Sequence, residues 1–203
     1  MELIVGTENQ GKLREMQEAL TPIQTDIHLV AVERYLTDFT APAENGTSYY
    51  DNALEKARFY SELLNKPVLA DDGGLELAAF PELLGVHTSR FFKSDTDSEK
   101  NQELLALYDT PELQSPAKQQ LTLRACLVYV SPTGKMLSAS AALSGRLVSP
   151  RGQGGYGFDP IFYLPTLGKT LAQLPTRQRN ALSPRIQALQ QLIPQIKELR
   201  END

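Results

Sequence analysis

The hydrophobic and polar positions of this chain follow two periods that alternate in its first third. Short apolar runs, such as Leu3 to Val5, have the length and composition of buried strands. Between these runs, apolar residues recur every three to four positions, as on one face of a helix. Thr47 or Ser48 can cap the second of these helices. These patterns predict strands at residues 3–5, 27–32 and 68–70, and helices that end near Leu20 and Asn65.

The second half of the chain has longer apolar stretches. Two of them flank a Ser-Pro-Thr-Gly turn at residues 131–134 and predict a long antiparallel hairpin. Polar or glycine-rich stretches at residues 38–46, 71–93 and 150–155 predict loops. The remaining patterns complete the prediction with strands at residues 120–130, 135–148 and 160–163 and helices at residues 98–108 and 184–201.

Together these elements predict an α/β fold with a long mixed β-sheet flanked by helices. Strands that alternate with helices favour parallel pairs, and the hairpin adds antiparallel pairs. Glycine-rich breaks near residues 73 and 154 predict a single bilobal domain over residues 1–203. Because ligands tend to bind in clefts, we expect the active site in the cleft between the lobes.

Composition narrows the class of protein. The 203 residues are 41% hydrophobic and 22% charged, which is typical of a globular protein, and the net charge of -5 argues against binding of long nucleic acids. A single cysteine, Cys126, rules out an internal disulfide framework and fits a reducing compartment. The amino terminus does not resemble a signal peptide, and no stretch approaches the roughly 20 apolar residues of a membrane helix. We therefore expect a cytoplasmic protein without a membrane partner.

Two adjacent carboxylates, Asp71 and Asp72, follow the apolar run that ends at Ala70 and precede Gly73 and Gly74. Paired acids at the end of a strand can hold a divalent cation such as Mg²⁺, which binds one or two carboxylates together with substrate phosphates. The same residues also form ordinary turns. The pair alone leaves both interpretations open, and in either case we expect Asp71 to position the turn.

A second candidate, Thr7-x-Asn9-x-x-Lys12, lies where a strand is followed by a helix. Backbone N–H groups at a helix start and a nearby lysine attract phosphate. Alternatively, Thr7 or Asn9 is only an N-cap, and Lys12 belongs to a solvated helix face. Both interpretations stay open from the local sequence.

Two further groups carry possible chemistry. Glu44 could be a second metal ligand, and Lys56, which shares a helix face with Asn52, could bind phosphate. Alternatively, Glu44 only favours the dipole of the following helix, and Lys56 is a surface residue. Tyr156 could stack on a base, and Asp159 could accept hydrogen bonds from that base. Alternatively, the Tyr156 ring simply enters the core, and Asp159 begins a turn. Arginines near the carboxyl terminus, among them Arg179 and Arg185, could contact phosphate or a base carbonyl.

Taken in order, these segments resemble the inosine triphosphate pyrophosphatase family, which hydrolyses non-standard purine nucleoside triphosphates. The resemblance covers nearly the whole chain. Its matching motifs are Thr7-x-Asn9-x-x-Lys12, Glu44-Asn45, Asn52-Ala53-x-x-Lys56-Ala57, Ala70-Asp71-Asp72-x-Gly74-Leu75, Gly85-x-x-x-x-Arg90 and residues 155–162, Gly-Tyr-Gly-Phe-Asp-Pro-Ile-Phe.

The resemblance implies a bilobal homodimer that uses Mg²⁺ to cleave ITP, dITP or XTP between the α- and β-phosphates, which clears them from the nucleotide pool. Asp72 would be the general base and, with Glu44, a metal ligand. The residues implied in phosphate binding are Thr7, Glu8, Asn9, Gln10, Gly11, Lys12, Lys56 and Gly73. Those implied in base binding are Tyr156, Gly157, Phe158, Asp159, Arg179, Pro184 and Arg185.

The chain departs from the family pattern in three places. Gly73 replaces a serine; Arg179 replaces a lysine and Pro184 the histidine of a Ser-His-Arg motif near the carboxyl terminus. Residues 85–90 are Gly-Val-His-Thr-Ser-Arg, where the family commonly has Gly-x-Tyr-Ser-Ala-Arg. Proline offers no hydrogen bond from its ring or its backbone nitrogen. Two alternatives therefore accompany the main hypothesis: a pyrophosphatase with relaxed or changed base specificity, like the Maf-type enzymes, and a nucleotide-binding module without turnover.

Overall fold

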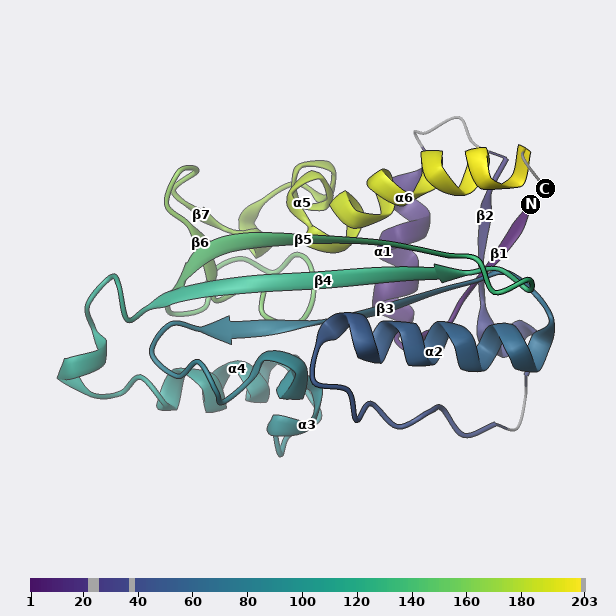
Figure 1. Cartoon of the computed structure of the whole chain (residues 1–203). Coiled ribbons are helices and arrows are strands. Elements are labelled where there is room, and N and C mark those ends of the chain that lie inside the picture. Colours follow the sequence, from purple (N-terminus) through teal and green to yellow (C-terminus); the bar gives the residue numbers. More distant parts are fainter. Residues whose placement is uncertain (22–25, 37–38, 202–203) are drawn as a thin grey trace. The chain divides into compact units, whose positions relative to one another are not determined.

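The protein is described by a computed structural model that covers residues 1–21, 26–36 and 39–201 (Figure 1). Its strands are β1 (Glu2–Val5), β2 (His28–Ala31), β3 (Val68–Leu77), β4 (Gln120–Val130), β5 (Met136–Leu147), β6 (Phe162–Leu164) and β7 (Lys169–Thr170). Its α-helices are α1 (Gln10–Leu20), α2 (Tyr49–Leu64), α3 (Thr88–Phe91), α4 (Asp97–Ala106), α5 (Thr176–Leu182) and α6 (Pro184–Glu201).

The strands form one mixed sheet in the order β2-β1-β3-β4-β5-β6-β7. β1 pairs in parallel with β2 and with β3, where Ile4 lies opposite Val68. β6 pairs antiparallel with β5 and with β7. The sheet combines both strand directions and is flanked by helices, which confirms the predicted α/β fold.

The chain divides into two compact units. Unit 1 contains residues 1–73, 125–141 and 184–203, and unit 2 contains residues 74–124 and 142–183. Strands β3, β4 and β5 each contribute residues to both units. The prediction of one bilobal domain with a cleft between its lobes stays a prediction.

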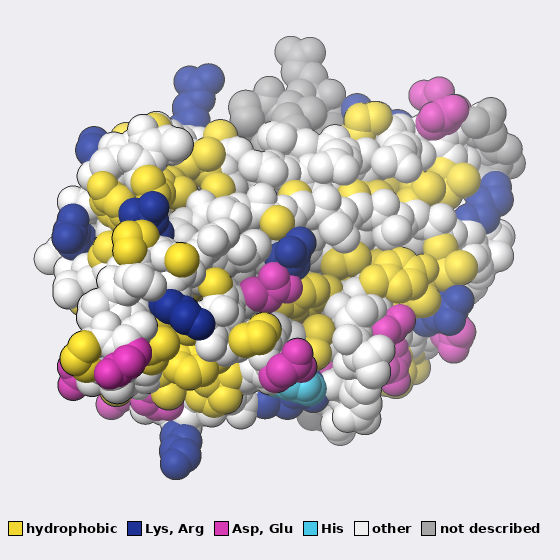
Figure 2. Space-filling model, turned by 60° about the vertical axis from the view of Figure 1, so that its left-hand side comes forward, with side chains coloured by type: hydrophobic (Ala, Val, Ile, Leu, Met, Phe, Trp, Pro, Cys, Tyr) yellow, Lys and Arg dark blue, Asp and Glu magenta, His cyan; other side chains and the backbone are white. Residues whose placement is uncertain are grey.

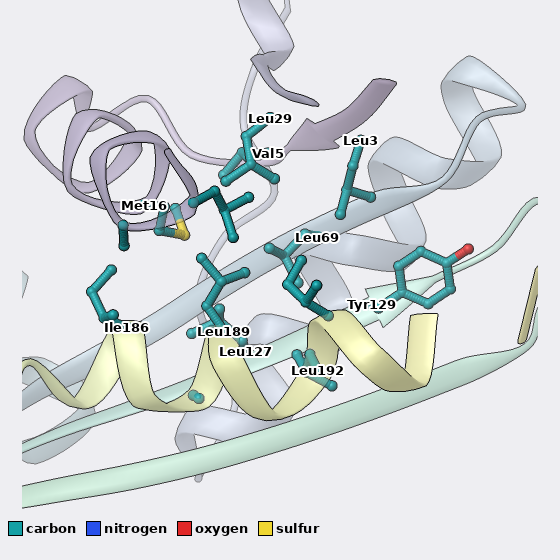
Figure 3. Close-up of a cluster of buried hydrophobic side chains, with 14 of the residues drawn as sticks. Leu3, Val5, Met16, Leu29, Leu69, Leu127, Tyr129, Ile186, Leu189 and Leu192 are labelled. Carbon is teal, nitrogen blue, oxygen red and sulfur yellow. The ribbon is translucent and has the colours of Figure 1, made fainter. Parts of the chain in front are cut away.

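Unit 1 has a hydrophobic cluster on each face of its strands, because successive side chains of a strand point to opposite sides. On one face, Leu3 and Val5 pack with residues of α1 and α6, among them Met16 and Leu189 (Figure 3). On the other face, Ile4 packs with α2 residues that include Tyr60. The strands of this unit are therefore covered by α1 and α6 on one side and by α2 on the other (Figure 1).

Unit 2 has its own core, built around the second half of β3. Leu75 and Leu77 belong to a buried cluster that also contains Leu104 of α4 and Phe162 of β6. Because each unit has a separate core, the residues of each candidate site are held by the packing of their own unit.

Most predicted elements are confirmed. Ser48 caps α2 as predicted, and α6 continues through Pro194. The predicted loop at residues 71–93 is wrong at its start, because β3 continues to Leu77, and near its end, where α3 forms. The short elements β7 and α5 were not predicted. Asp38, the first residue of another predicted loop, lies outside the described residues.

The glycines of β3 explain why a strand occupies a segment with the composition of a turn. A Cβ on Gly74 would lie 2.2 Å from the carbonyl oxygen of Gly85, so only glycine fits there. Thr88 completes this contact, because its Oγ1 accepts from the Leu75 amide at 3.0 Å and donates to the Gly85 carbonyl at 2.6 Å. Gly74 therefore marks a close approach of two backbone segments within the strand.

Candidate active site

Asp71 is the most deeply buried charged group of unit 1. The side chain has no exposed surface, and it forms ion pairs with Lys12 of α1 at 2.7 Å and with Arg185 of α6 at 2.9 Å. Burial alone would raise the pKa of Asp71, but the charges of Arg185 and Lys12 outweigh it and hold that pKa well below its usual range. The expectation that Asp71 positions a turn is wrong, because the residue lies inside β3 and joins two helices to it.

Arg185 extends this group of charges to a fourth residue. Its guanidinium also binds Glu15 of α1 at 2.6 Å. Arg185 and Pro184, the buried first residue of α6, therefore lie in unit 1, with Lys12 and Asp71. Tyr156 and Asp159, which the resemblance assigns to the same base-binding role, lie in unit 2.

Asp72 is also buried, but its surroundings raise the pKa of its carboxyl group, whereas those of Asp71 lower it. Burial raises the pKa of the Asp72 carboxyl, and the nearby acids Glu44 and Asp71 add to the rise, against the opposing effects of Lys56 and Asn52. Asn52 donates to Asp72 Oδ2 at 3.0 Å, which fixes the orientation of the carboxylate. A fixed carboxylate with a raised proton affinity has the properties of a general base.

Asn52 is a site residue to which sequence reasoning gave no role. While its Nδ2 binds Asp72, its Oδ1 accepts from the Gly46 amide at 2.7 Å. The side chain thus connects the acidic residue of β3 to the loop that carries Glu44. Its one sequence signal was the spacing of four residues from Lys56 on α2.

Lys56 and Glu44 form the third part of the unit 1 site. Lys56 Nζ donates to Glu44 Oε1 and, at 2.7 Å, to the backbone carbonyl of Asp71. The side chain of Lys56 is largely buried, with 11% of its surface exposed. The alternative that Lys56 is a free surface residue is therefore wrong.

The donor atoms of this site fit a hard divalent cation. No group of three or more His, Cys, Asp and Glu side chains that could hold a metal by themselves occurs in the described ranges. Glu44 and Asp72 do offer two carboxylates close enough for the charge of Glu44 to act on Asp72. Mg²⁺ commonly binds through one or two carboxylates and completes its shell with water and substrate phosphates.

The loop before α1 is an ordinary capped helix start. Asn9 Oδ1 accepts from the amides of Gly11 at 2.9 Å and Lys12 at 3.1 Å. Asn9 is therefore an N-cap, as one of the two alternatives predicted. The other half of that alternative is wrong, because Lys12 is paired with Asp71 and is not part of a solvated face.

The remaining residues implied in phosphate binding lie around this loop and at the end of unit 1. The Thr7 hydroxyl accepts from the Asn9 backbone amide at 3.3 Å. The side-chain amide of Gln10 donates to the Glu33 carboxylate at 3.3 Å. Glu8 is exposed, and Gly73 is the half-buried last residue before unit 2.

In unit 2, the segment from Gly155 to Asp159 folds around one carboxylate. Asp159 Oδ2 accepts from the Tyr156 amide at 3.2 Å and pairs with Arg179 Nε at 3.6 Å. Gly155 has φ +74°, and a Cβ there would lie 1.8 Å from the same carboxylate oxygen. The segment is therefore closed by Asp159, and only glycine can occupy position 155.

Two aromatic rings of this segment have different surroundings. The Phe158 ring packs against Phe92 with a centroid distance of 5.6 Å, whereas the Tyr156 side chain is exposed over 39% of its surface. An exposed aromatic ring beside a hydrogen-bonding carboxylate can stack on a base while the carboxylate contacts its edge. Tyr156 is therefore the exposed aromatic ring of this segment.

Two α4 residues that sequence reasoning missed contact the same segment. Asp97 Oδ2 accepts from the Gly157 amide at 2.6 Å, and Asn101 Nδ2 donates to the Gly157 carbonyl at 3.0 Å. Their spacing of four residues places them on one helix face. That spacing was visible in the sequence, but nothing in it pointed to a partner more than 50 residues away.

Comparison with known proteins places the chain in a family. The sequence profile of the Ham1 family matches residues 3–195 of the chain. The chain belongs to the Ham1 family. Among its Ham1 relatives, the dITP/XTP pyrophosphatase of Geobacter sulfurreducens is 36% identical over 191 residues, which are 92% of each chain. The dITP/XTP pyrophosphatase of Lactobacillus johnsonii is 36% identical over 96% of this chain and 94% of the relative.

Solved Ham1 structures have the same fold. The Ham1 protein of Coxiella burnetii matches with a TM-score of 0.81 and 32% identity, over 98% of this chain and 99% of that one. The Staphylococcus aureus Ham1 protein matches with a TM-score of 0.80 and 28% identity over the same shares. The family resemblance predicted from the ordered motifs is confirmed.

Proposed function

We propose that this protein is a pyrophosphatase that hydrolyses non-standard purine nucleoside triphosphates, such as dITP, XTP and ITP, to the nucleoside monophosphate and pyrophosphate. The observation that carries the proposal is Asp72, a buried carboxylate that Asn52 orients and that lies beside the Lys56–Glu44 pair. The Ham1 relatives that carry the name dITP/XTP pyrophosphatase support this substrate class.

In the proposed reaction, Asp72 accepts a proton from the attacking water while the phosphoanhydride bond between the α- and β-phosphates breaks. Water attacks the α-phosphorus, pyrophosphate leaves, and the water oxygen ends in the nucleoside monophosphate. Glu44 and Asp72 would hold Mg²⁺, which would neutralise phosphate charge and favour ionisation of water. The proposed phosphate-binding residues are Lys12, Lys56, Gly73, Thr7, Glu8, Asn9, Gln10 and Gly11.

For the base, we assign stacking to the exposed ring of Tyr156 and hydrogen bonding to Asp159. Arg179 supports this assignment because it pairs with the Asp159 carboxylate. The rest of the proposed base-binding set is Gly157, Phe158, Pro184 and Arg185. Arg185 also binds Asp71 and Glu15.

The proposed partners are the nucleotide substrate and a second copy of the chain, with a cytoplasmic location. None of the described helices is long and apolar enough to cross a bilayer. On the face drawn in Figure 2, Lys and Arg side chains are dispersed among acidic and uncharged ones and form no continuous basic patch. A long nucleic acid, which binds through many adjacent cations, is therefore not proposed as a partner.

The test is release of pyrophosphate from a panel of purine and pyrimidine triphosphates, with Mg²⁺ and with chelator. Preference for dITP and XTP over dATP and dGTP supports the proposal. Equal or pyrimidine-biased turnover would instead support a changed base specificity, which the replacements at Arg179 and Pro184 make the second candidate. Binding without any product in folded protein would leave only a nucleotide-binding module.

The role of Asp72 is tested separately. Asp72→Asn should abolish turnover, because an amide cannot take the proton, while nucleotide affinity stays within about threefold. Asp26→Asn, an exposed substitution of the same type, is the control and should retain full activity. Near-normal turnover in Asp72→Asn would contradict the mechanism.

A further inference from the structure

One residue of the proposed base-binding segment is held at both of its backbone polar groups by a single helix. The Gly157 amide donates to Asp97 Oδ2 at 2.6 Å, and its carbonyl accepts from Asn101 Nδ2 at 3.0 Å. Asp97 and Asn101 lie four residues apart on α4, so they project from one helix face. All three residues belong to unit 2.

Packing alone does not fix this part of the segment. Gly157 has φ +60°, and a Cβ placed on it would have no atom within 4 Å, so its conformation is not imposed by close neighbours. Glycine is the residue that loses most conformational freedom on folding. The two hydrogen bonds from α4 are therefore the contacts that hold the Gly157 peptide groups.

Asn101 is built for this contact. Its side chain is 3% exposed, although asparagine is usually found at the surface. A buried amide costs free energy unless it makes hydrogen bonds, and Nδ2 bonds to Gly157, whereas Oδ1 has no hydrogen-bond partner among the described residues. Its position is consistent with a fixed bond to the segment.

We infer that Asp97 and Asn101 are positioning residues for nucleobase recognition, an inference that rests on the proposed function. They hold the Gly157 peptide so that the Tyr156 ring and the Asp159 carboxylate keep the spacing that a purine requires. Within the described part of the chain, the hydrogen bonds of the two side chains go to Gly157 and to no residue proposed to bind phosphate or metal. Their loss should weaken base binding and leave the chemistry at the phosphates unchanged.

Asp97 offers a set of three matched variants. Asp97→Ala removes the acceptor and should raise KM for dITP by about tenfold with kcat unchanged. Asp97→Asn keeps a carbonyl oxygen and should restore KM to within about twofold of wild type. Glu99→Ala removes the same charge from the same helical turn but does not contact Gly157, and it should have the KM of wild type.

Asn101 provides an independent second test. Asn101→Leu keeps the approximate volume but removes the donor and should raise KM for dITP as Asp97→Ala does, whereas Gln102→Leu on the exposed face should not. Circular dichroism verifies that each variant is folded. Hydrogen exchange of the Gly157 amide, which needs no substrate, should be at least tenfold faster in Asp97→Ala than in wild type.

These measurements separate the inference from the proposed function. If wild type turns over none of the triphosphates, the proposed function fails, while the exchange rate still reports whether Asp97 holds Gly157. The inference is overturned if Asp97→Ala and Glu99→Ala change KM equally, if kcat falls while KM stays constant, or if exchange at Gly157 is the same in wild type and Asp97→Ala.

Discussion

Replacing Asp71 with asparagine removes a negative charge at a position where solvent cannot compensate for it. The carboxylate is fully buried between Lys12 and Arg185, at 2.7 and 2.9 Å. Asparagine keeps the volume but leaves Lys12 without its carboxylate partner and leaves Arg185 with Glu15 alone of its two carboxylates in this group. Removal of one partner of a buried pair costs about 3–5 kcal/mol in the free energy of unfolding. That is a large part of the 5–15 kcal/mol that typically separates folded from unfolded states.

The chain contains a control with the same geometry and different burial. Arg200 pairs with Asp26 at 2.9 Å, but these side chains are 38% and 61% exposed. Asp26→Asn should therefore cost much less than Asp71→Asn, because water screens the exposed pair. The chain has no tryptophan, so urea unfolding is followed by far-ultraviolet circular dichroism. Equal losses of unfolding free energy in the two variants would refute the argument from burial.

The pH dependence of the unfolding free energy provides a second test of the same prediction. Arg185 and Lys12 hold the pKa of Asp71 well below its usual value, despite its burial. A lowered pKa contributes stability that is fully present above about pH 4, the unfolded value, and that is lost as the pH falls toward the folded value. Wild type should therefore lose stability below pH 4 more steeply than Asp71→Asn. Parallel curves for the two proteins would contradict the low pKa.

Three further predictions concern other parts of the chain. Tyr108→Phe should leave the unfolding free energy at pH 7 unchanged or raise it by about 1 kcal/mol, because the buried hydroxyl has no hydrogen-bond partner among the described residues. Burial raises the pKa of Tyr108 to about 12, so the variant should also lose less stability than wild type between pH 10 and 12, measured by circular dichroism. Gly74→Ala should destabilise by about 1–3 kcal/mol in urea unfolding, since its Cβ would lie 2.2 Å from the Gly85 carbonyl oxygen. Glu44→Gln should raise the Mg²⁺ concentration for half-maximal activity at least about tenfold, in a metal titration of pyrophosphate release.

Much of the fold follows from local pattern. The apolar run at residues 3–5 and the stripe of α2 are strong periodic signals, and both elements form as predicted. The second half of β3 was missed because residues 71–74, Asp-Asp-Gly-Gly, have the composition of a turn. A strand forms there because it contributes Leu75 and Leu77 to the core of unit 2 and lets Gly74 approach Gly85. The helix α5 has no buried residue and therefore no apolar stripe to predict it.

The residue types of the site could be predicted from the sequence, but the contacts between these residues could not. The resemblance gave Asp71 and Asp72 different roles, but only the structure shows their different partners, two cations for Asp71 and Asn52 for Asp72. The Arg185–Asp71 pair joins positions 114 residues apart, and no local pattern encodes such a distance. Long-range pairs of this kind arise from packing, which a single sequence reveals only through resemblance to a family.

The charges of the unit 1 site explain why metal should act on nucleotide binding as well as on turnover. The group joined by the contacts described above holds three cationic and four acidic side chains and has a formal charge of -1, from Lys12, Lys56, Arg185, Glu15, Glu44, Asp71 and Asp72. Every cation of the group already contacts a carboxylate or carbonyl, so a triphosphate without metal meets a site with no spare positive charge. One divalent cation reverses the sign of the group. Glu44→Gln should accordingly weaken nucleotide binding with Mg²⁺ present and strengthen it in chelator, and a change of the same sign in both conditions would contradict this charge balance.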